Sequence, residues 1–424
     1  MLENIVDDVF TGVYHLNLSL HFYGADDLPG SLLSLHPLRH ALFRDQSDLI
    51  IPISNENSRA GFWFRIENET DVQFKTFVIP SNTYRSILEV FISSHGDDEF
   101  WYSNPPNVYI EKNNLTTTRG NGAFRNVFVT IDGKFAGAIM PFPVIFTGGI
   151  NPLFWSPVVA IGAFDLPSYH LDITPFLGLL LDGEPHELGL GVTNGTSFWL
   201  IDANLHLWLD SNSDRVTSKL VRYQAPPLIL SGDSEFKNLN GAFKIEAATK
   251  VHFAGWVNSS IGNFTTDVEQ KMKYKSLLLF RNNGDFKEVL MKGKMKNDVK
   301  IKNKLEIILQ REVYKSKYPL LLITSTLKDD NNTYTVKTNL SHSLNEKKNT
   351  IVGDRVVHSS SLIDTQNAFG WMKVKDHSVL SGTARSHQTY RFQDAGGCHF
   401  RKISARDGEL LYDNSTNSCA AHAW

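Results

Sequence analysis

Eight consecutive residues bring together groups that can do chemistry. They are Asp97, Asp98, Glu99, Phe100, Trp101, Tyr102, Ser103 and Asn104. Carboxyl groups can transfer protons, and flat aromatic faces pack against sugar rings. The combination suits a site that holds a sugar and polarises a bond attached to it. The alternative interpretation is a solvated acidic turn that lies over a buried tryptophan.

Alternating strands flank this segment and must position it. Apolar and polar residues alternate with period two, which is typical of strands with one buried face. Asp132 and Gly133 form a two-residue hairpin signal between two of these strands. A strand leads into the acidic segment, and Pro105-Pro106 ends it. The alternating stretches in this half are residues 13–23, 86–93, 126–131, 135–139 and 197–210.

The second half shows the same organisation and no long helix. Residues 282–285 and 329–332 are turn signals between further alternating stretches. No long stretch of the chain has the 3.6-residue period of a helix. Many short strands at near-regular spacing predict antiparallel β-sandwiches. We place a domain boundary in the polar stretch 211–230, which ends in Ala225-Pro226-Pro227.

The composition is that of a globular protein with an uneven distribution of charge. The chain has 424 residues, 42% of them apolar, which suggests two or three domains. Residues 1–230 carry 13 Lys and Arg against 25 Asp and Glu, whereas residues 231–424 carry 29 against 20. Solvated strand faces explain the basic half, and docking of the two oppositely charged halves is the alternative. No apolar run is long enough to span a membrane, and no RNA-recognition motif is present, so we expect neither a membrane span nor a nucleic-acid partner.

Several loop and strand segments together resemble one enzyme family. The segments are residues 100–107, 148–155, 161–169, 172–177 and 201–210. They resemble the plant peptide-N-glycanase A family, whose members are peptide-N4-(N-acetyl-β-glucosaminyl)asparagine amidases that remove N-glycans from asparagine. The resemblance is specific over most of residues 1–230. It is looser over 231–424, where the spacing around Cys398 and Cys419 also fits the family.

The resemblance implies an all-β fold of antiparallel jelly-roll-type β-sandwiches with a C-terminal β domain. We expect residues 1–43 to be the remnant of a first sandwich, 44–215 to be a jelly-roll glycoamidase domain, 216–230 to be a linker and 231–424 to be the C-terminal domain. Leu2-Glu3-Asn4-Ile5 corresponds to a point inside the family's chains, so the sequence looks like a member that begins late.

The implied reaction is hydrolysis of the amide between asparagine and N-acetylglucosamine in glycopeptides or glycoproteins. A few carboxyl groups can do this with no metal and no cofactor. By similarity to bacterial two-jelly-roll glycoamidases, Glu99 and Glu3 are the catalytic candidates, with Asp98 as a helper. The early aspartate of that plan has no counterpart here, and position 5 is Ile where the plan has Trp. We therefore expect little or no glycoamidase activity from this chain as written.

Five other residues are expected to contact the glycan or the peptide. Trp101 and Trp155 provide rings for sugar stacking, and Tyr102, Asn104 and Arg125 provide polar contacts. Two other classes of function remain open. One is a non-catalytic carbohydrate-binding protein in which the tryptophans hold a glycan. The other is a purely structural β protein.

Sequons and cysteines bear on the compartment. The family is secreted or vacuolar, yet residues 1–8 lack the basic and apolar regions of a signal peptide. In a secreted protein Cys398 and Cys419 would form one disulfide, whereas in the cytosol they would stay thiols. Nine Asn-x-Ser/Thr sequons suit a secreted glycoprotein: Asn17, Asn68, Asn114, Asn194, Asn258, Asn263, Asn331, Asn339 and Asn414.

Overall fold

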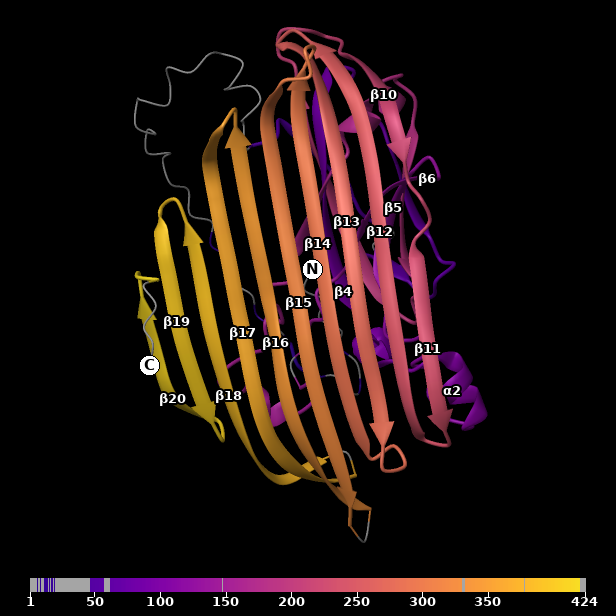
Figure 1. The fold of residues 1–424 in the computed structure, drawn as a ribbon, viewed down its shortest axis with the longest axis vertical. Coiled ribbons are helices and arrows are strands. Elements are labelled where there is room, and N and C mark those ends of the chain that lie inside the picture. Colours follow the sequence, from indigo (N-terminus) through magenta and orange to yellow (C-terminus); the bar gives the residue numbers. More distant parts are fainter. Residues whose placement is uncertain are drawn as a thin grey trace.

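The computed structural model places an antiparallel β-sandwich behind one very large β-sheet (Figure 1). It describes residues 46–56, 62–146, 148–329, 332–376 and 378–419, together with eight isolated residues between 6 and 19. Glu3 and most of the alternating stretch 13–23 lie outside the described residues. The expectations for them stay predictions.

The first sheet of the sandwich is five-stranded and holds the strand that leads into the acidic segment. Its path is β1-β9-β4-β7, and β2 also pairs with β9. The alternation expected around residue 90 is present, because every second residue of β4 is buried. The strands are β1 (Leu49–Ile53), β2 (Phe64–Ile66), β4 (Thr83–Ser94), β7 (Ser168–Asp172) and β9 (Trp199–Leu209).

The second sheet of the sandwich is four-stranded, with the order β3-β8-β5-β6. The predicted hairpin turn is present, since Asp132 and Gly133 have φ of +48° and +73°. Positive φ at both positions is the type I′ geometry that the twist of a hairpin favours. The strands are β3 (Gln73–Phe77), β5 (Asn126–Ile131), β6 (Lys134–Ile139) and β8 (His186–Thr193). Short helices in the connections are η2 (Gly96–Asp98), η3 (Trp101–Ser103), α2 (Asn107–Lys112), η4 (Pro152–Trp155), η5 (Thr174–Phe176) and α3 (Leu177–Leu180).

The second half of the chain forms one eleven-stranded antiparallel sheet, which we call sheet C. From β12 to β20 each strand pairs with the next in sequence, and β10 and β11 both pair with β12. Its strands are β10 (Thr217–Gln224), β11 (Ile229–Lys237), β12 (Asn240–Ser259), β13 (Gly262–Arg281), β14 (Phe286–Asn303), β15 (Ile308–Lys328), β16 (Thr333–Val352), β17 (Arg355–Lys375), β18 (Ser378–Asp394), β19 (Gly397–Arg406) and β20 (Glu409–Thr416).

One face of sheet C packs against the sandwich, and the two regions share one hydrophobic core. The core runs from Val129 and Leu205 in the sandwich to Met291 and Leu322 in sheet C. Polar contacts also join the two regions: the backbone amide of Ala138, on edge strand β6, donates to Gln270 Oε1 over 2.9 Å. A side chain thus satisfies an amide that β6 leaves unpaired at its open edge.

The fold class expected from the sequence is confirmed, and two details differ. Residues 216–230 were expected to be a linker, but residues 217–224 form β10 and pair with β12. The strands of sheet C were expected to be short, whereas β13 has 20 residues and β15 has 21. Among the described residues, no helix is long and apolar enough to cross a membrane.

Candidate active site

The acidic segment is held at the end of β4 by the turn that precedes β9. His95 stacks between Phe146 and Phe198, with ring centroids 5.6 and 5.1 Å away. Gly96 has φ of +55°, and a Cβ there would lie 2.8 Å from the backbone oxygen of Ser197. The next amide, that of Asp97, donates to the same oxygen over 2.6 Å. Only glycine fits this close approach, so the sequence His95-Gly96 fixes where the three carboxylates begin.

Asp98 is completely buried and accepts six hydrogen bonds. Arg125 binds it in a bidentate manner, from Nε to Oδ2 over 2.7 Å and from Nη2 to Oδ1 over 2.6 Å. Thr196 donates through its backbone amide and its hydroxyl, over 2.8 and 2.5 Å. The indole Nε1 of Trp199 donates over 2.6 Å, and Asn104 Nδ2 over 3.0 Å.

Arg125 is equally well satisfied. Its remaining donors reach the backbone oxygens of Gly120, Gly122 and Phe124 over 2.8 to 3.0 Å. A buried charge pair is tolerated only when each member finds such partners. Asp98 therefore holds the turn in place and has no lone pair left for a substrate. Arg125 is also fully buried. The helper role of Asp98 and the substrate contact of Arg125 stay predictions.

Glu99, the next residue, is half-buried and has a different environment. Burial raises the pKa of Glu99 above its ordinary value, and the guanidinium of Arg119 partly opposes this. The hydroxyl of Tyr102, which is fully buried, has no hydrogen-bond partner among the described residues. Its pKa is raised by burial and by the charge of Glu99. A carboxyl group with a raised pKa beside a buried hydroxyl is suited to carry a proton at mildly acidic pH.

Arg119 is the cation that acts on Glu99. Its guanidinium carbon lies 5.3 Å from the centre of the Phe100 ring, over its face. Lys287 comes from β14, in the sequence-distant sheet C. Burial, assisted by the charge of Arg119, lowers the pKa of Lys287 to about 8. Arg119 thus interacts electrostatically with both Glu99 of the sandwich and Lys287 of sheet C.

The aromatic residues of the segment do not present free faces. Trp101 is 1% exposed, and its ring lies 6.5 Å from Trp199 and 6.4 Å from Tyr274. Tyr102 packs at 5.8 Å against Trp101. Both residues belong to the core that joins the sandwich to sheet C. The predicted stacking of a sugar on Trp101 and the predicted contact to Tyr102 are corrected: both rings are core residues beneath the site.

Trp155 is also buried. Its indole Nε1 donates to the backbone oxygen of Gly149 over 2.9 Å, and its ring packs against Phe154. The short helix η4 that carries it docks on β17 and β18, where Gly370 and Gly382 leave room for Phe154 and Leu153. Trp155 therefore anchors this loop to sheet C and offers no groove-lining face, contrary to expectation.

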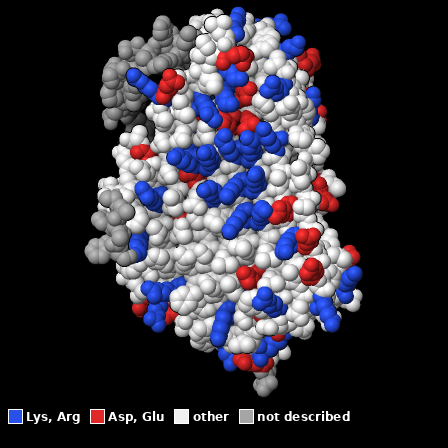
Figure 2. Space-filling view, in the orientation of Figure 1, with Lys and Arg blue, Asp and Glu red and all other residues white. Residues whose placement is uncertain are grey.

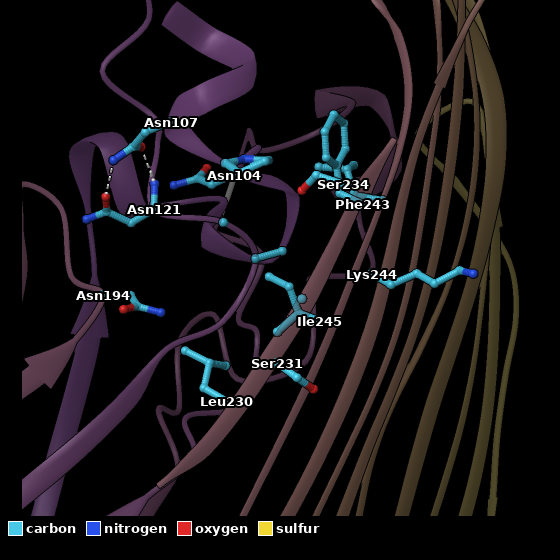
Figure 3. Close-up of a pocket in the computed structure, with 15 residues that line it drawn as sticks. Asn104, Asn107, Asn121, Asn194, Leu230, Ser231, Ser234, Phe243, Lys244 and Ile245 are labelled. Atoms are coloured by element: carbon cyan, nitrogen blue, oxygen red, sulfur yellow. Dashed lines mark hydrogen bonds between the residues drawn. The ribbon is translucent and has the colours of Figure 1, made fainter. Parts of the chain in front are cut away.

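A pocket of about 290 Å³ opens beside the segment, between the sandwich and strands β11 and β12 (Figure 3). Asn104 lines it and is almost fully buried, and its contact with a substrate stays a prediction. Asn107 and Asn121 are joined by two hydrogen bonds of 2.8 and 2.7 Å, and Lys244 points away from them. Amide and hydroxyl groups with one aromatic ring are common in sugar sites. The remaining lining includes Asn194, Leu230, Ser231, Ser234, Phe243 and Ile245.

Most sequons are described, and none of these asparagines is buried. Asn331 lies outside the described residues, and Asn194 lines the pocket just described. Glycosylation at any of the nine positions stays a prediction. Cys398 and Cys419 form the disulfide that a secreted protein would contain, with Cα atoms 5.7 Å apart. Within the described ranges, no cluster of His, Cys, Asp and Glu has the arrangement of a metal site.

Sequence reasoning missed several residues of this site. Thr196 comes from the turn before β9 and Trp199 is the first residue of β9, both about a hundred residues from Asp98. Lys287 comes from sheet C. Arg119 and Asn121 lie in a polar loop, which only weakly indicated a functional role. The segments that resemble the family do not include this loop. Only the three-dimensional pairing of β4 with β9 brings the first two into reach.

Comparisons with known proteins agree with the resemblance. The family profile described as Peptide N-acetyl-beta-D-glucosaminyl asparaginase amidase A matches residues 1–226. A Prunus dulcis protein named Peptide-N4-(N-acetyl-beta-glucosaminyl)asparagine amidase A is 42% identical over 419 residues. The match covers 99% of this chain and 72% of that protein. No solved structure matches.

The match therefore extends through sheet C, well beyond the part that the profile covers. The sandwich, the acidic turn and the eleven-stranded sheet are all included in it. On these grounds the chain belongs to the peptide-N-glycanase A family of amidases.

Proposed function

We propose that this protein hydrolyses, at the low rate expected from its sequence, the amide bond between asparagine and N-acetylglucosamine in N-glycopeptides, with Glu99 as the proton donor. Water adds to the amide carbon, the carbon–nitrogen bond breaks, and the proton goes to the departing nitrogen. The products are aspartate and a glycosylamine, which later loses ammonia. The observation that carries the proposal is a half-buried carboxyl of raised pKa on a rigidly held turn.

A raised pKa is what the donor role requires. A carboxyl group that keeps its proton at mildly acidic pH can donate to the amide while charge develops on it. Arg119, the cation that acts on Glu99, can stabilise negative charge on the attacked carbonyl oxygen. The unpartnered hydroxyl of Tyr102 is a further donor next to Glu99, although it is buried in this structure.

Asp98 supports this site by holding the turn that carries Glu99. Its six hydrogen bonds and the Arg125 ion pair fix the backbone on the N-terminal side of Glu99. Small errors in the placement of a catalytic group reduce rate strongly, so a rigid support is useful. Glu3 remains the predicted second carboxyl, and it lies outside the described residues.

A matched pair of variants tests the role of Glu99. Glu99→Gln removes the proton donor, and Glu111→Gln makes the same chemical change on the exposed surface of α2. Release of glycan from a glycopeptide and binding of that glycopeptide are both measured. We expect Glu99→Gln to lose about 100-fold or more in turnover with binding retained. Turnover of Glu99→Gln equal to that of Glu111→Gln would contradict the proposal.

A non-catalytic carbohydrate-binding function is the second candidate, favoured by the asparagine-lined pocket. Leu230→Trp fills the pocket, whereas Ile229→Trp places the same ring on the opposite face of β11. Loss of glycopeptide binding in Leu230→Trp alone, with no turnover in the native chain, would assign the protein to this second class.

We also propose that the protein follows the secretory route to the cell exterior or the vacuole. Support comes from the Cys398–Cys419 disulfide and from sequons at exposed positions such as Asn68 and Asn414. Mass spectrometry of the protein isolated from its source tests this. N-glycans on these asparagines would support the route, and unmodified asparagines with free thiols would contradict it.

A further inference from the structure

The outer face of sheet C carries lysines in three adjoining cross-strand rows. Strand register places Lys271 opposite Lys296, and Lys296 opposite Lys315. Lysines directly opposite one another on adjacent strands lie only about 5 Å apart at their Cβ atoms. We call the following ten residues the lysine face: Lys250, Lys271, Lys296, Lys315 and Lys347 in the first row, Lys273, Lys294 and Lys317 in the second, and Lys275 and Lys292 in the third.

The lysine face points away from the sandwich. Met272, Tyr274, Met291 and Met295, which alternate with these lysines along β13 and β14, are buried against the sandwich core. Figure 2 shows the resulting band of basic side chains across the middle of the open face. These ten lysines therefore do not dock sheet C onto the acidic half, and the alternative raised from the sequence does not hold for them.

Nearby carboxylates neutralise only part of this charge. Glu269 pairs with Lys250 and Lys271 over 3.1 and 2.6 Å. Glu246 pairs with Lys275, and Asp298 with Lys296, each over 2.7 Å. The other six make no ion pair within the part of the chain that the structure describes: Lys273, Lys292, Lys294, Lys315, Lys317 and Lys347.

This arrangement opposes folding. Like charges directly opposite one another on a sheet are destabilising, and three unpaired lysines share the second row. Neither the core nor the strand pairing requires lysine at solvent-facing positions, where Thr or Gln would serve. The face instead offers a flat grid of ammonium groups, with strands about 5 Å apart and successive outward residues about 7 Å apart along each strand.

We propose that the lysine face binds a linear acidic polysaccharide that carries one carboxylate on each sugar. Such a chain presents single negative charges at a regular repeat, comparable to the spacing of neighbouring strands. Lysine binds anions as a mobile point charge, which suits a partner whose register along the sheet is not fixed. The binding would keep the enzyme within a matrix of acidic carbohydrate, and it does not depend on the proposed reaction at Glu99.

Other polyanions fit the face less well. No Phe, Tyr or Trp stands among the ten lysines in these rows, so stacking with the bases of single-stranded nucleic acid is absent. A membrane would require large exposed apolar side chains for insertion, and the rows contain none. An acidic protein would require buried aromatic or arginine anchors, which the face also lacks.

The test uses polygalacturonate as the probe and a triple variant of the second row. Lys273, Lys294 and Lys317 are replaced by Gln together. The matched control replaces three exposed lysines at strand ends outside the rows, Lys237, Lys304 and Lys375, and so removes the same charge. Affinity is measured by calorimetry over a series of salt concentrations, with neutral dextran and single-stranded DNA as further probes.

We expect the native protein to bind polygalacturonate in a salt-dependent way and to ignore dextran. The second-row variant should lose about tenfold or more in affinity, and the control should stay within about twofold. The melting temperature of the second-row variant should equal or exceed that of the native protein, because contacts between like charges are removed. Equal losses in the two variants, no binding at physiological salt, or tighter binding of the DNA than of polygalacturonate would each overturn the proposal.

Discussion

The sandwich encloses the charged pair of Asp98 and Arg125, whereas sheet C exposes rows of lysines to solvent. In the sandwich, Asp98 and Arg125 are fully enclosed, and hydrogen bonds satisfy both carboxylate oxygens and all the guanidinium donors. On sheet C, Lys273, Lys294 and Lys317 stand side by side with no partner among the described residues. The first arrangement holds the turn that carries Glu99 in one place, and catalytic groups need such accurate placement. The second repeats itself, as recognition of a repetitive partner requires.

Loops account for much of this difference. The sandwich connects its strands through segments such as residues 95–125, which wrap around the ends of β4 and β9 and carry the candidate site. Sheet C uses tight turns, such as Asn282-Asn283-Gly284, between strands of about 20 residues. A regular meander leaves no loop long enough to build a buried site.

The buried pair gives the largest expected effect. Asp98→Asn leaves the Arg125 guanidinium enclosed without its counter-charge, so we expect a loss of about 3–5 kcal/mol in the free energy of unfolding. Asp97→Asn, one position earlier and partly exposed, should change it by less than about 0.5 kcal/mol. Urea denaturation of both variants measures the contrast. A loss below about 1 kcal/mol for Asp98→Asn would mean that the pair does not support the turn.

A buried histidine in sheet C gives the second effect. His342 of β16 is 1% exposed, and neither ring nitrogen has a hydrogen-bond partner among the described residues. Burial lowers the pKa of His342 to about 4. The unfolded chain takes up a proton near pH 6.5, before the folded one does, so stability is full above that pH and is lost as the pH falls toward 4.

His342→Leu should remove this dependence. The shift corresponds to about 3 kcal/mol between neutral and acidic pH. Urea denaturation at pH 7.5 and at pH 4 compares the native protein with the variant. The variant should lose about 2–3 kcal/mol less than the native protein on acidification. Equal losses in the two proteins would show that the imidazole is solvated or paired in solution.

The disulfide should contribute less to the free energy of unfolding than the two features above. It should stabilise only the edge of sheet C formed by β19 and β20. It joins Cys398, at the start of β19, to Cys419, beyond the end of β20, with a separation of 21 residues. We expect Cys398→Ser with Cys419→Ser to cost no more than about 3 kcal/mol. Limited proteolysis should cut within residues 397–419 first. Early cleavage in the sandwich instead would show that this edge stabilises the whole molecule.

The smallest effect concerns the lysine face. Lys294 has unpaired lysines opposite it on both sides, so Lys294→Gln should raise the free energy of unfolding by about 0.2–1 kcal/mol. Lys375→Gln, at the end of β17, should leave it unchanged. Thermal melts at low and high salt measure this, and the gain should shrink in salt. A loss of stability in Lys294→Gln would mean that the lysine packs favourably.

The sequence predicted four of the nine sandwich strands that the described residues form, those in which the alternation is strong. Residues 126–131 coincide with β5, and residues 86–93 fall within β4. The strands of sheet C were harder to predict from the sequence. In the middle of β13 and β14 the outward positions are lysine, which has a weak strand preference, so the sequence indicated the turns at 282–285 and 329–332 more clearly than the strands.

The functional role of segment 97–104 stays a prediction. The structure shows that Trp101 and Tyr102 within it are core residues. Their identity as aromatics says nothing about which face is free, since burial depends on Tyr274 and Trp199, far away in the chain. The sequence alone does not show that Asp98 is fully buried whereas Glu99 is only half-buried. Only the fold brings Arg125, Thr196 and Trp199 into contact with Asp98.

The pH dependence of glycan release by the native protein and by Glu99→Gln tests the central claim most directly. If Glu99 acts as a proton donor with a raised pKa, the native rate falls as the pH rises through that pKa, since the donor is then ionised. The variant should show a low rate with no such fall. A variant that retains both the rate and the pH profile of the native protein would show that the reaction does not use Glu99.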